Sequence, residues 1–418
     1  MSERFAVYVH IPFCTIKCGY CDFNAYAGMD SLKDAYGAAL VAEVRANAPF
    51  FEGKTVTSIG FGGGTPGEMP PEHIAAVIQA IHDQAPLLNG AEVTLEANPG
   101  TLSAAALAAL HRAGLNRLSI GAQSFHSHEL GFLDRIHSPE ATAACVDLAR
   151  RAGFRNIGLD LIYGLPGQSM EEWLASLDAA IALAPDHLSC YALTVEDGTL
   201  LARRVREGKV IPADSDAVAD MYEAASERLE AAGFVQYELS NWAGRGGKSE
   251  HNFTYWSDGE YMAIGAGAHG YLGFERYENI SHPKAYIQAI RANPGPRPAL
   301  AAIHELSFRV EVSDWIALHL RTAQGLLIQA FEERFGFTLQ SVLHLELDEL
   351  AAAGVLEIDD VARLTPRGRL LHSEVAARVR AALDAHDLPL PRHGSIEHER
   401  RLKRDLPSGS RPAPSPER

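Results

Sequence analysis

Three cysteines within eight residues form the densest group of metal-binding side chains in the sequence. Cys14, Cys18 and Cys21 make a C-x3-C-x2-C pattern in the segment HIPFCTIKCGYCDF. A structural zinc site usually takes paired C-x2-C units, and no second pair follows. A redox dithiol needs two cysteines and leaves the first unexplained. An iron–sulfur cubane takes four ligands, so three thiolates leave one iron open to a small molecule. The spacing by itself leaves these three chemistries open.

The two remaining cysteines have ordinary surroundings. Cys145 and Cys190 lie in the apolar runs TAACVDLA and HLSCYAL, which predicts buried thiols. An odd total of five cysteines, with no signal-peptide pattern at the N-terminus, disfavours a disulfide framework.

The elements that must position the cysteines follow an alternating pattern. Short runs of β-branched and aromatic residues alternate with longer helical stretches, which predicts βα units around a parallel sheet. Strands are expected at 5–10, 55–61, 92–97, 117–121, 157–162 and 187–193, and helices at 71–84, 104–111 and 141–151. Six such units predict an α/β fold, a partial, TIM-like (β/α)6 barrel.

Chemically capable residues follow or end five of these strands. The cysteine loop follows the first, Gly62-Gly63-Gly64-Thr65-Pro66 the second, and Glu96 ends the third. Gln123 follows the fourth and Asp160 lies within the fifth. Because ligands gather at the C-terminal ends of such strands, we expect one shared rim. Taken singly, the glycines could form a turn, Glu96 a helix cap and Gln123 a loop hydrogen bond.

In combination, these motifs resemble those of radical S-adenosylmethionine (radical SAM) proteins. The cysteine pattern with Tyr20 before its last member is similar to the cluster motif of that superfamily, and GGGTP to its loop for the ligand's amino group. The resemblance extends to the family of oxygen-independent coproporphyrinogen III oxidase and its HemW-type haem chaperone branch. Six matching motifs occur in the same order over roughly residues 5–275: YVHIPFC, GFGGGTP, LEANPG, RLSIGAQSF, DLIYGLPGQ and YELSNWA.

The resemblance implies that Cys14, Cys18 and Cys21 ligate a [4Fe–4S] cluster whose open iron is chelated by S-adenosylmethionine (SAM). Tyr8, Gly63 and Glu96 match residues that contact this ligand in the oxidase. Six further residues match positions that contact a second SAM molecule in the oxidase: Tyr20, Gly64, Thr65, Gln123, Arg135 and Asp160. In this protein they are expected either to complete one SAM site or to line the cavity. The implied chemistry is one-electron reduction of the sulfonium to methionine and a 5′-deoxyadenosyl radical. It needs a low-potential donor such as flavodoxin or ferredoxin.

Three features favour the chaperone branch over the oxidase. Phe23 stands where the oxidase pattern adds a fourth cysteine, and only thirteen residues precede Cys14, where the oxidase carries a long extension. Residues 251–256 read HNFTYW, matching the H-N-x-x-Y-W motif of the chaperones. Ser249 stands where chaperone members commonly carry a cysteine, so thiol attachment of haem at that point is not expected.

Haem ligation is the role predicted for the HNFTYW motif. A neutral imidazole is a standard axial ligand of haem iron, and aromatic faces pack on a porphyrin. His251 is therefore the predicted ligand, with Tyr255 and Trp256 beside it. From spacing alone, a core histidine with aromatic neighbours is the alternative. His137 and His269 are rival ligands.

The C-terminal region has a different pattern. Helices expected at 314–321, 330–335, 340–353 and from 366, with a hairpin over 355–358 and 361–364, predict a small winged-helix-like domain that acts as a lid or docks a partner. Residues 340–385 hold five basic against eight acidic side chains, which disfavours phosphate contact. The expected domains are a barrel (1–240), a haem-motif segment and connection (241–298), the C-terminal domain (299–386) and a disordered tail (387–418).

Composition restricts the partners. The 418 residues include 37 basic and 53 acidic side chains, for a formal charge of −16, and 47 % are hydrophobic. Nucleic acid is not expected, because clustered basic residues are missing outside the tail. No apolar run is long enough to span a bilayer, so we expect a cytoplasmic protein with at most transient membrane contact.

The leading hypothesis is a haem chaperone that passes haem to acceptor proteins such as respiratory haem enzymes. Oxidative decarboxylation of coproporphyrinogen III is the alternative, and a radical enzyme acting on another substrate is a third. We expect no coproporphyrinogen oxidase activity, whereas the complete ligand rim suggests that cleavage of SAM is retained.

Overall fold

The computed structural model describes residues 3–273, 275–385 and 387–388. Of the tail expected at 387–418, residues 389–418 lie outside the described residues. The chain divides into two compact units, Met1–Glu305 and Leu306–Arg418. The division falls after Glu305 and not at 298, because the strand Leu300–Glu305 pairs with the sheet of the first unit.

A twelve-stranded sheet organises the first unit, in the order β14-β13-β12-β11-β1-β4-β5-β6-β7-β8-β10-β9. Six consecutive strands in this order run parallel, as the sequence predicted. They are β1 (Glu3–Ile11), β4 (Lys54–Gly63), β5 (Leu87–Ala97), β6 (Arg117–Gln123), β7 (Asn156–Tyr163) and β8 (His187–Ala192). Because β14 and β9 remain at the two edges, the barrel is open, and the partial (β/α)6 prediction is confirmed.

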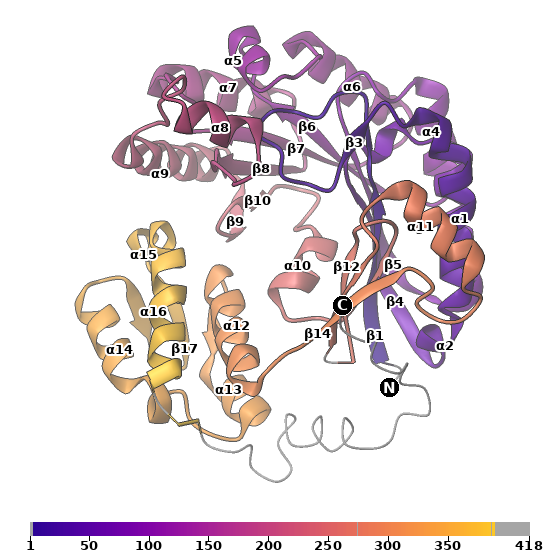
Figure 1. Cartoon of the computed structure of the whole chain (residues 1–418). Helices are drawn as coiled ribbons and strands as arrows, with labels where there is room; N and C mark the ends of the chain where they lie inside the picture. The colour runs from indigo at the N-terminus through magenta and orange to yellow at the C-terminus, as the bar shows by residue number, and fades with distance from the viewer. Residues whose placement is uncertain (1–2, 274, 386, 389–418) are drawn as a thin grey trace. The chain divides into compact units, whose positions relative to one another are not determined.

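Helices cover the outside of the parallel strands (Figure 1). They include α1 (Lys33–Ala46), α3 (Pro71–Gln84), α4 (Ala104–Arg112), α6 (Pro139–Arg151), α7 (Met170–Ala182) and α9 (Ser215–Ala231). In α3, the residues Ile74, Val77 and Ile81 recur at helical spacing and are buried. Val7 and Val9 of β1 are also fully buried. The apolar core therefore includes this layer of helix and strand side chains.

The interior of the barrel is polar. Ser58 bonds to His251, Arg117 donates to Thr94 at 3.2 Å, and Ser119 donates to Asp160 at 3.1 and 3.2 Å. Because side chains alternate along a strand, each strand sends apolar residues to the helices and polar ones inward. This alternation places functional groups inside the barrel.

Further strands extend both edges of the six-stranded parallel sheet, and the sequence predicted none of them. On one side, β11 (Tyr261–Ile264) pairs in parallel with β1. Beyond it, β12 (His269–Leu272), β13 (Glu275–Asn279) and β14 (Leu300–Glu305) pair in antiparallel order. β10 (Asn241–Ala243) and β9 (Val235–Glu238) extend the other edge. The segment 241–298 thus supplies strands to the main sheet.

The second unit combines helices with a small sheet. Its helices are α12 (Phe308–Arg321), α13 (Ile328–Phe335), α14 (Gln340–Ala352), α15 (Pro366–Leu370) and α16 (His372–Ala385). Strands β16 (Leu356–Ile358) and β17 (Val361–Leu364) form the expected hairpin, which β15 (Leu326–Leu327) joins. Trp315, Phe331 and Phe335 lie in its apolar core. The helices and the hairpin match the predicted elements.

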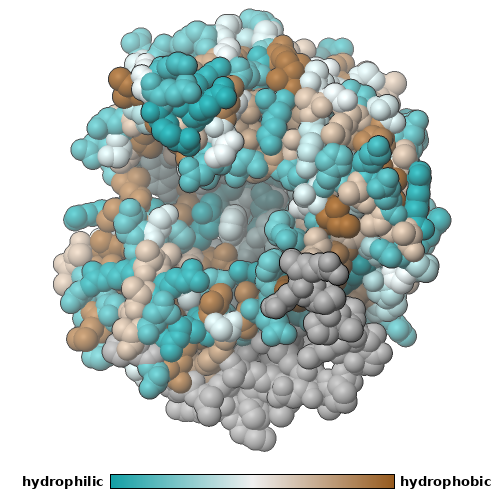
Figure 2. All heavy atoms as spheres, viewed as in Figure 1, coloured by the Kyte–Doolittle hydropathy of each residue, from teal (hydrophilic) through white to brown (hydrophobic). Residues whose placement is uncertain are grey.

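Hydrophobic and hydrophilic residues are interspersed on the face shown in Figure 2. Among the described residues, no helix combines the length and the apolar character needed to cross a membrane.

Candidate functional site

A cavity of about 410 Å³ lies at the C-terminal ends of the parallel strands. Its walls bring together the three cysteines and every residue predicted to bind SAM except Tyr8. These are Cys14, Cys18, Cys21, Tyr20, Gly63, Gly64, Thr65, Glu96, Gln123, Arg135 and Asp160. The five segments that the sequence placed at strand ends thus share one rim.

The cysteine loop is tied to the barrel by two carboxylates that sequence reasoning missed. Glu68 accepts hydrogen bonds from the N–H and the hydroxyl of Thr15, at 2.9 and 2.8 Å. Asp134 accepts a hydrogen bond from the N–H of Gly19 at 3.0 Å. Both lie beside predicted residues, Glu68 just after the GGGTP loop and Asp134 before Arg135, which is the only sequence signal they carry. They hold the loop over the cavity.

The three thiols of the cysteine loop are free and face the rim cavity. Burial raises the pKa of Cys14 to about 11 and also raises the pKa of Cys18 and Cys21. Deprotonated thiols here would therefore need a positive partner such as iron.

Glycine at position 64 is required by close packing of two loops. A Cβ at this position would lie 2.7 Å from the carbonyl oxygen of Phe13 and 3.0 Å from the sulfur of Cys14. The N–H of Gly64 donates to the carbonyl of Ile11 at 2.8 Å, and the N–H of Thr65 to that of Phe13 at 2.8 Å. The GGGTP loop therefore lies directly against the cysteine loop.

Two carboxylates face the cavity. Solvent reaches Glu96 through the opening, yet the surrounding protein and the charge of Asp160 raise its pKa to about 7. Burial also raises the pKa of Asp160, which accepts hydrogen bonds from Ser119. These groups could bind a ligand that carries positive charge.

Among the cationic side chains that line the cavity, Arg135 is held by hydrogen bonds. Arg135 donates to the side-chain oxygen of Asn98 at 3.0 Å and lies 4.0 Å from the sulfur of Cys18. Asn98 also donates to Thr65 at 3.1 Å, so it links two predicted residues, although the sequence offered it only as part of LEANPG. Gln123 has a φ of 64°, a conformation that is uncommon for a residue with a Cβ. Such strain often marks functional sites.

Tyr8 lies below the cavity and is not among the described residues that line it. Its hydroxyl is 2.9 Å from Nδ1 of His10, and its ring stacks on His251 with centroids 6.3 Å apart. A Cβ at Gly62 would lie 3.0 Å from the Tyr8 ring and 3.1 Å from Glu96. Tyr8 thus connects the cavity wall with the HNFTYW segment.

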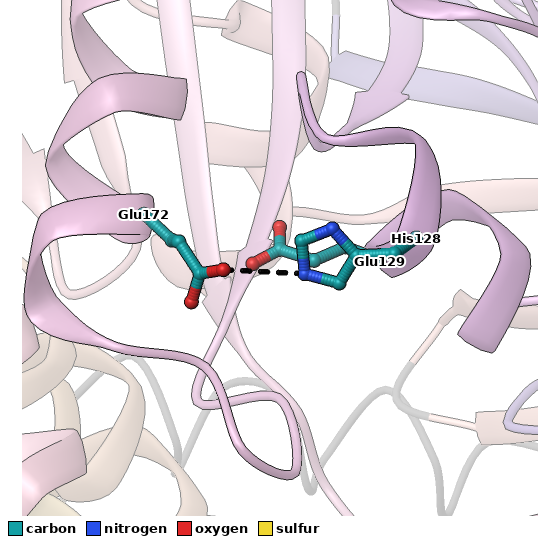
Figure 3. A group of neighbouring side chains, drawn as sticks. All are labelled: His128, Glu129 and Glu172. Atoms are coloured by element: carbon teal, nitrogen blue, oxygen red, sulfur yellow. Dashed lines mark ion pairs between the residues drawn. The ribbon is translucent and has the colours of Figure 1, made fainter.

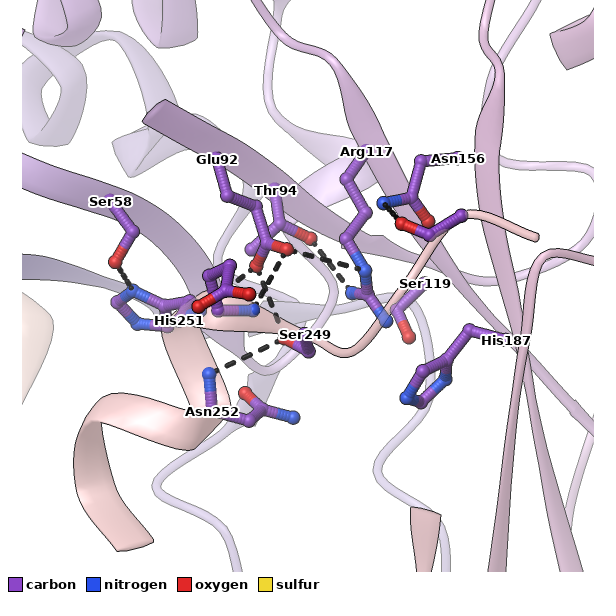
Figure 4. A network of polar contacts seen from close by, with 12 residues as sticks. Ser58, Glu92, Thr94, Arg117, Ser119, Asn156, His187, Ser249, His251 and Asn252 are labelled. Atoms are coloured by element: carbon purple, nitrogen blue, oxygen red, sulfur yellow. Dashed lines mark hydrogen bonds and ion pairs between the residues drawn. The ribbon is translucent and has the colours of Figure 1, made fainter. Parts of the chain in front are cut away.

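The HNFTYW segment forms a helix inside the barrel, α10 (Glu250–Trp256). Figure 4 shows how Glu92 of β5 holds its start. The Glu92 carboxylate accepts hydrogen bonds from the Ser249 hydroxyl and from the N–H groups of Glu250 and His251, all at 3.1 Å. Arg117 lies 3.8 Å from the same carboxylate. Ser58 and Glu92 lie further from the rim than Glu96, so α10 occupies a deeper level of the barrel.

His251 is 3 % exposed, and both of its ring nitrogens are hydrogen bonded. Nδ1 is 2.9 Å from the Ser58 hydroxyl and Nε2 is 2.8 Å from the Tyr255 hydroxyl. A Cβ at Gly60 would lie 2.2 Å from Nε2, so only glycine allows this packing. Burial lowers the pKa of His251 to about 3. In this conformation neither nitrogen is free for iron.

The rival histidines lie elsewhere. His137 is half-buried near the rim, with Nε2 3.1 Å from the carbonyl of Ala122. His269 is 67 % exposed on β12, 3.6 Å from Glu278. Neither contacts α10 through a hydrogen bond described here. A larger hollow of about 790 Å³, beside Arg150, Arg155 and Arg245, contains none of the predicted site residues.

Comparisons with known proteins agree with this fold. Residues 8–180 match the model of the Radical SAM superfamily, and residues 309–371 match the HemN C-terminal domain. The structure matches that of coproporphyrinogen III oxidase (HemN) from Escherichia coli with a TM-score of 0.79, at 23 % identity, over 91 % of this chain and 90 % of that chain. The fold is that of a radical SAM protein.

Similarity to curated proteins is more specific. The heme chaperone HemW of Mycobacterium tuberculosis is 39 % identical over 90 % of this chain and 94 % of its own length. HemW of Bacillus subtilis is 36 % identical over 88 % of this chain and 97 % of its own length. The mitochondrial radical S-adenosyl methionine domain-containing protein 1 of Bos taurus is 36 % identical over 86 % of this chain and 83 % of its own length. The chain belongs to the HemW branch of the radical SAM superfamily.

Proposed function

We propose that the protein is a haem chaperone that holds a [4Fe–4S] cluster and SAM in the rim cavity and passes haem to an acceptor protein. The observation that carries the proposal is the rim cavity, where three free thiols meet the residues predicted to bind SAM. Family membership adds that relatives matched over 88 to 90 % of this chain are named heme chaperones.

The residues of the cavity fit both cofactors. Cys14, Cys18 and Cys21 would hold the cluster, and the lack of a side chain at Gly64 leaves the space beside the sulfur of Cys14 free. Glu96 and Asp160 offer negative charge to the ammonium and sulfonium groups of SAM, and Arg135 offers positive charge to its carboxylate. When bound, a reduced cluster of this kind supplies one electron to the sulfonium.

Haem would use a second part of the molecule. His251 is the proposed axial ligand, with Tyr255 and Trp256 beside it, and binding requires α10 to leave its place in the barrel. Two exposed apolar side chains at the cavity mouth, Ile16 and Phe23, offer a surface for the face of a porphyrin. Phe23 also occupies the place of the oxidase's fourth cysteine, which favours the chaperone over the oxidase.

The partners follow from this proposal. Haem-accepting proteins, respiratory haem enzymes among them, would receive the haem in the cytoplasm. A flavodoxin or ferredoxin would reduce the cluster. Because the cavity retains every predicted SAM residue except Tyr8 in its wall, reductive cleavage of SAM is the second activity we propose.

Haem titration tests the chaperone. The anaerobically reconstituted protein is titrated with haem, followed by visible absorption, beside His251→Ala and the control His269→Ala, which changes an exposed histidine. We expect saturable one-to-one binding that weakens at least tenfold in His251→Ala and is unchanged in His269→Ala. Far-UV circular dichroism and cluster absorption establish that each variant is folded.

Three results would count against the proposal or against its haem ligand. Equal haem binding by His251→Ala would move the ligand to another histidine, with His137 tested next. Failure of the native protein to bind haem would contradict the chaperone. Formation of protoporphyrinogen from coproporphyrinogen, with reductant and SAM present, would establish the oxidase instead.

A further inference from the structure

A second group of metal-binding side chains lies outside the rim cavity. His128 and Glu129 belong to α5 (Ser127–Phe132), and Glu172 lies in the first turn of α7. One ligand atom from each residue lies within 4.8 Å of the other two. Figure 3 shows the three side chains pointing toward one another from two helices. Among the described residues this is the one group of three with that spacing, and none of its members lines the rim cavity.

Neutral donors hold both carboxylates in place. Glu129 is 3 % exposed and accepts hydrogen bonds from the Ser124 hydroxyl and, at 3.0 Å, from the Gln168 amide. Glu172 accepts two hydrogen bonds on Oε2, from the N–H and hydroxyl of Ser169 at 2.8 and 2.9 Å. Its other oxygen, Oε1, lies 3.3 Å from Nε2 of His128. Carboxylates that ligate metals are commonly oriented by such surrounding hydrogen bonds.

The charge of this group calls for a cation. A buried carboxylate is costly unless a positive group or a metal compensates it, and the hydrogen-bond partners of Glu129 are neutral. His128 is 66 % exposed, so its imidazole is accessible from solvent and can bind an ion without rearrangement of the core. Imidazole nitrogen and carboxylate oxygen are both zinc ligands, and three protein ligands would leave a fourth position open for water.

We propose that His128, Glu129 and Glu172 bind a divalent transition metal, for which Zn²⁺ is the best match. The ion would join α5 to the start of α7. Ser124, which contacts Glu129, follows Gln123 in the chain, and α5 leads into Arg135. The metal would therefore brace the segment 123–135, which supplies two residues of the rim cavity.

Zinc binding by the full chain provides the test. Equilibrium dialysis with Zn²⁺ is performed on a protein in which Cys14, Cys18 and Cys21 are replaced by serine, because the rim thiols would otherwise bind the ion. We expect one Zn²⁺ per chain, with affinity reduced about 10- to 100-fold in His128→Ala and in Glu129→Gln. His73→Ala is the matched control, because His73 also pairs with a carboxylate, that of Asp34 at 3.0 Å, but has no second one.

Cobalt adds a readout of coordination. Co²⁺ bound at this site is expected to show d–d absorption bands that Zn²⁺ removes and that are missing in His128→Ala. Zn²⁺ binding of equal affinity in His128→Ala, or no binding beyond that of a protein lacking both His128 and Glu129 side chains, would overturn the proposal. His128 and Glu172 would then be only a surface ion pair. Because His128 is exposed, its replacement tests the site without disturbing the fold.

Discussion

The rim cavity and helix α10 occupy two levels of one barrel interior and are built in opposite ways. The cavity is open, and its thiols, carboxylates and guanidinium face a space of about 410 Å³. α10 fills its space, and its first residues satisfy one carboxylate, Glu92, while His251 uses both ring nitrogens. The cavity leaves its polar groups accessible to a ligand, whereas α10 leaves neither ring nitrogen of His251 without a hydrogen-bond partner. Tyr8 lies between the two levels and contacts both.

Loss of a rim cysteine should have the largest effect. Cys14→Ser, Cys18→Ser and Cys21→Ser are each expected to lose the cluster completely, measured as iron and sulfide content after anaerobic reconstitution. Cys190→Ser, which changes a buried thiol outside the cavity, is the control. Urea unfolding of the cluster-free proteins should change little in the rim variants, because the three cysteines are only partly buried. Full iron content in any rim variant would contradict the assignment.

Glu92→Gln should weaken the deeper level. The change breaks the ion pair of Glu92 with the buried Arg117 and removes the charge that holds α10. Breaking a buried pair costs about 3–5 kcal/mol, which urea denaturation would measure. Glu250→Gln, at an exposed carboxylate of the same helix, should cost far less. If release of α10 makes His251 available, Glu92→Gln should also bind haem more tightly, and unchanged affinity would argue against that coupling.

The two levels should respond to pH in opposite directions. His251 has a folded-state pKa of about 3, below its ordinary value of 6.5, so acid favours the unfolded chain, which takes up the proton. Its stabilising contribution is complete above pH 6.5 and falls as the pH drops toward 3. The pKa of Glu96 is raised to about 7, so the folded chain binds this proton more tightly than the unfolded chain does. The contribution of Glu96 to stability is therefore complete below pH 4.5 and is lost as the pH rises toward 7. Titration of His251 should cost about 2 kcal/mol between pH 7.5 and 5.0.

The difference between the native protein and His251→Gln isolates this contribution. The native free energy of unfolding, measured in urea at both pH values, should fall further on acidification than that of the variant. Equal falls in the two proteins would show that His251 does not titrate as a buried neutral group.

Ser249→Ala should have the smallest effect. The Ser249 hydroxyl accepts the N–H of Asn252 at 3.3 Å and donates to Glu92, so it caps α10. Loss of such a cap costs about 1 kcal/mol in urea denaturation. Ser257→Ala, at the other end of the helix, is the control. A cost as large as that of Glu92→Gln would mean that the cap, and not the ion pair, holds the helix.

Periodicity in the sequence was sufficient for the parallel strands. All six strands and the helices at 71–84, 104–111 and 141–151 appear near their predicted bounds, because each buries apolar residues at a regular spacing. The strands at the edges escaped prediction. β10 and β12 have three and four residues, too few to show a period, and their place depends on pairing with distant strands.

The order of residues at the strand ends was sufficient to predict the rim cavity. It was not sufficient to predict that α10 lies inside the barrel, below the rim. Residues that follow parallel strands meet at one edge, so the rim could be anticipated from order alone. The position of His251 depends on contacts with Ser58 and Glu92, which lie far away in the chain. The sequence around His251 contains no signal for contacts with residues so distant in the chain. Glu68 and Asp134 were missed for the same reason.

The pairing of β1 with β11 has a consequence for the order of synthesis. β1 ends at Ile11 and β11 begins at Tyr261, so the ribosome adds about 250 residues before this side of β1 finds its partner. At about 5–20 residues per second, that interval lasts roughly 10–50 s. Every residue of the rim cavity, up to Glu196, leaves the ribosome before α10 does. In a nascent chain, the rim cysteines are therefore synthesised well before the helix that fills the interior of the barrel.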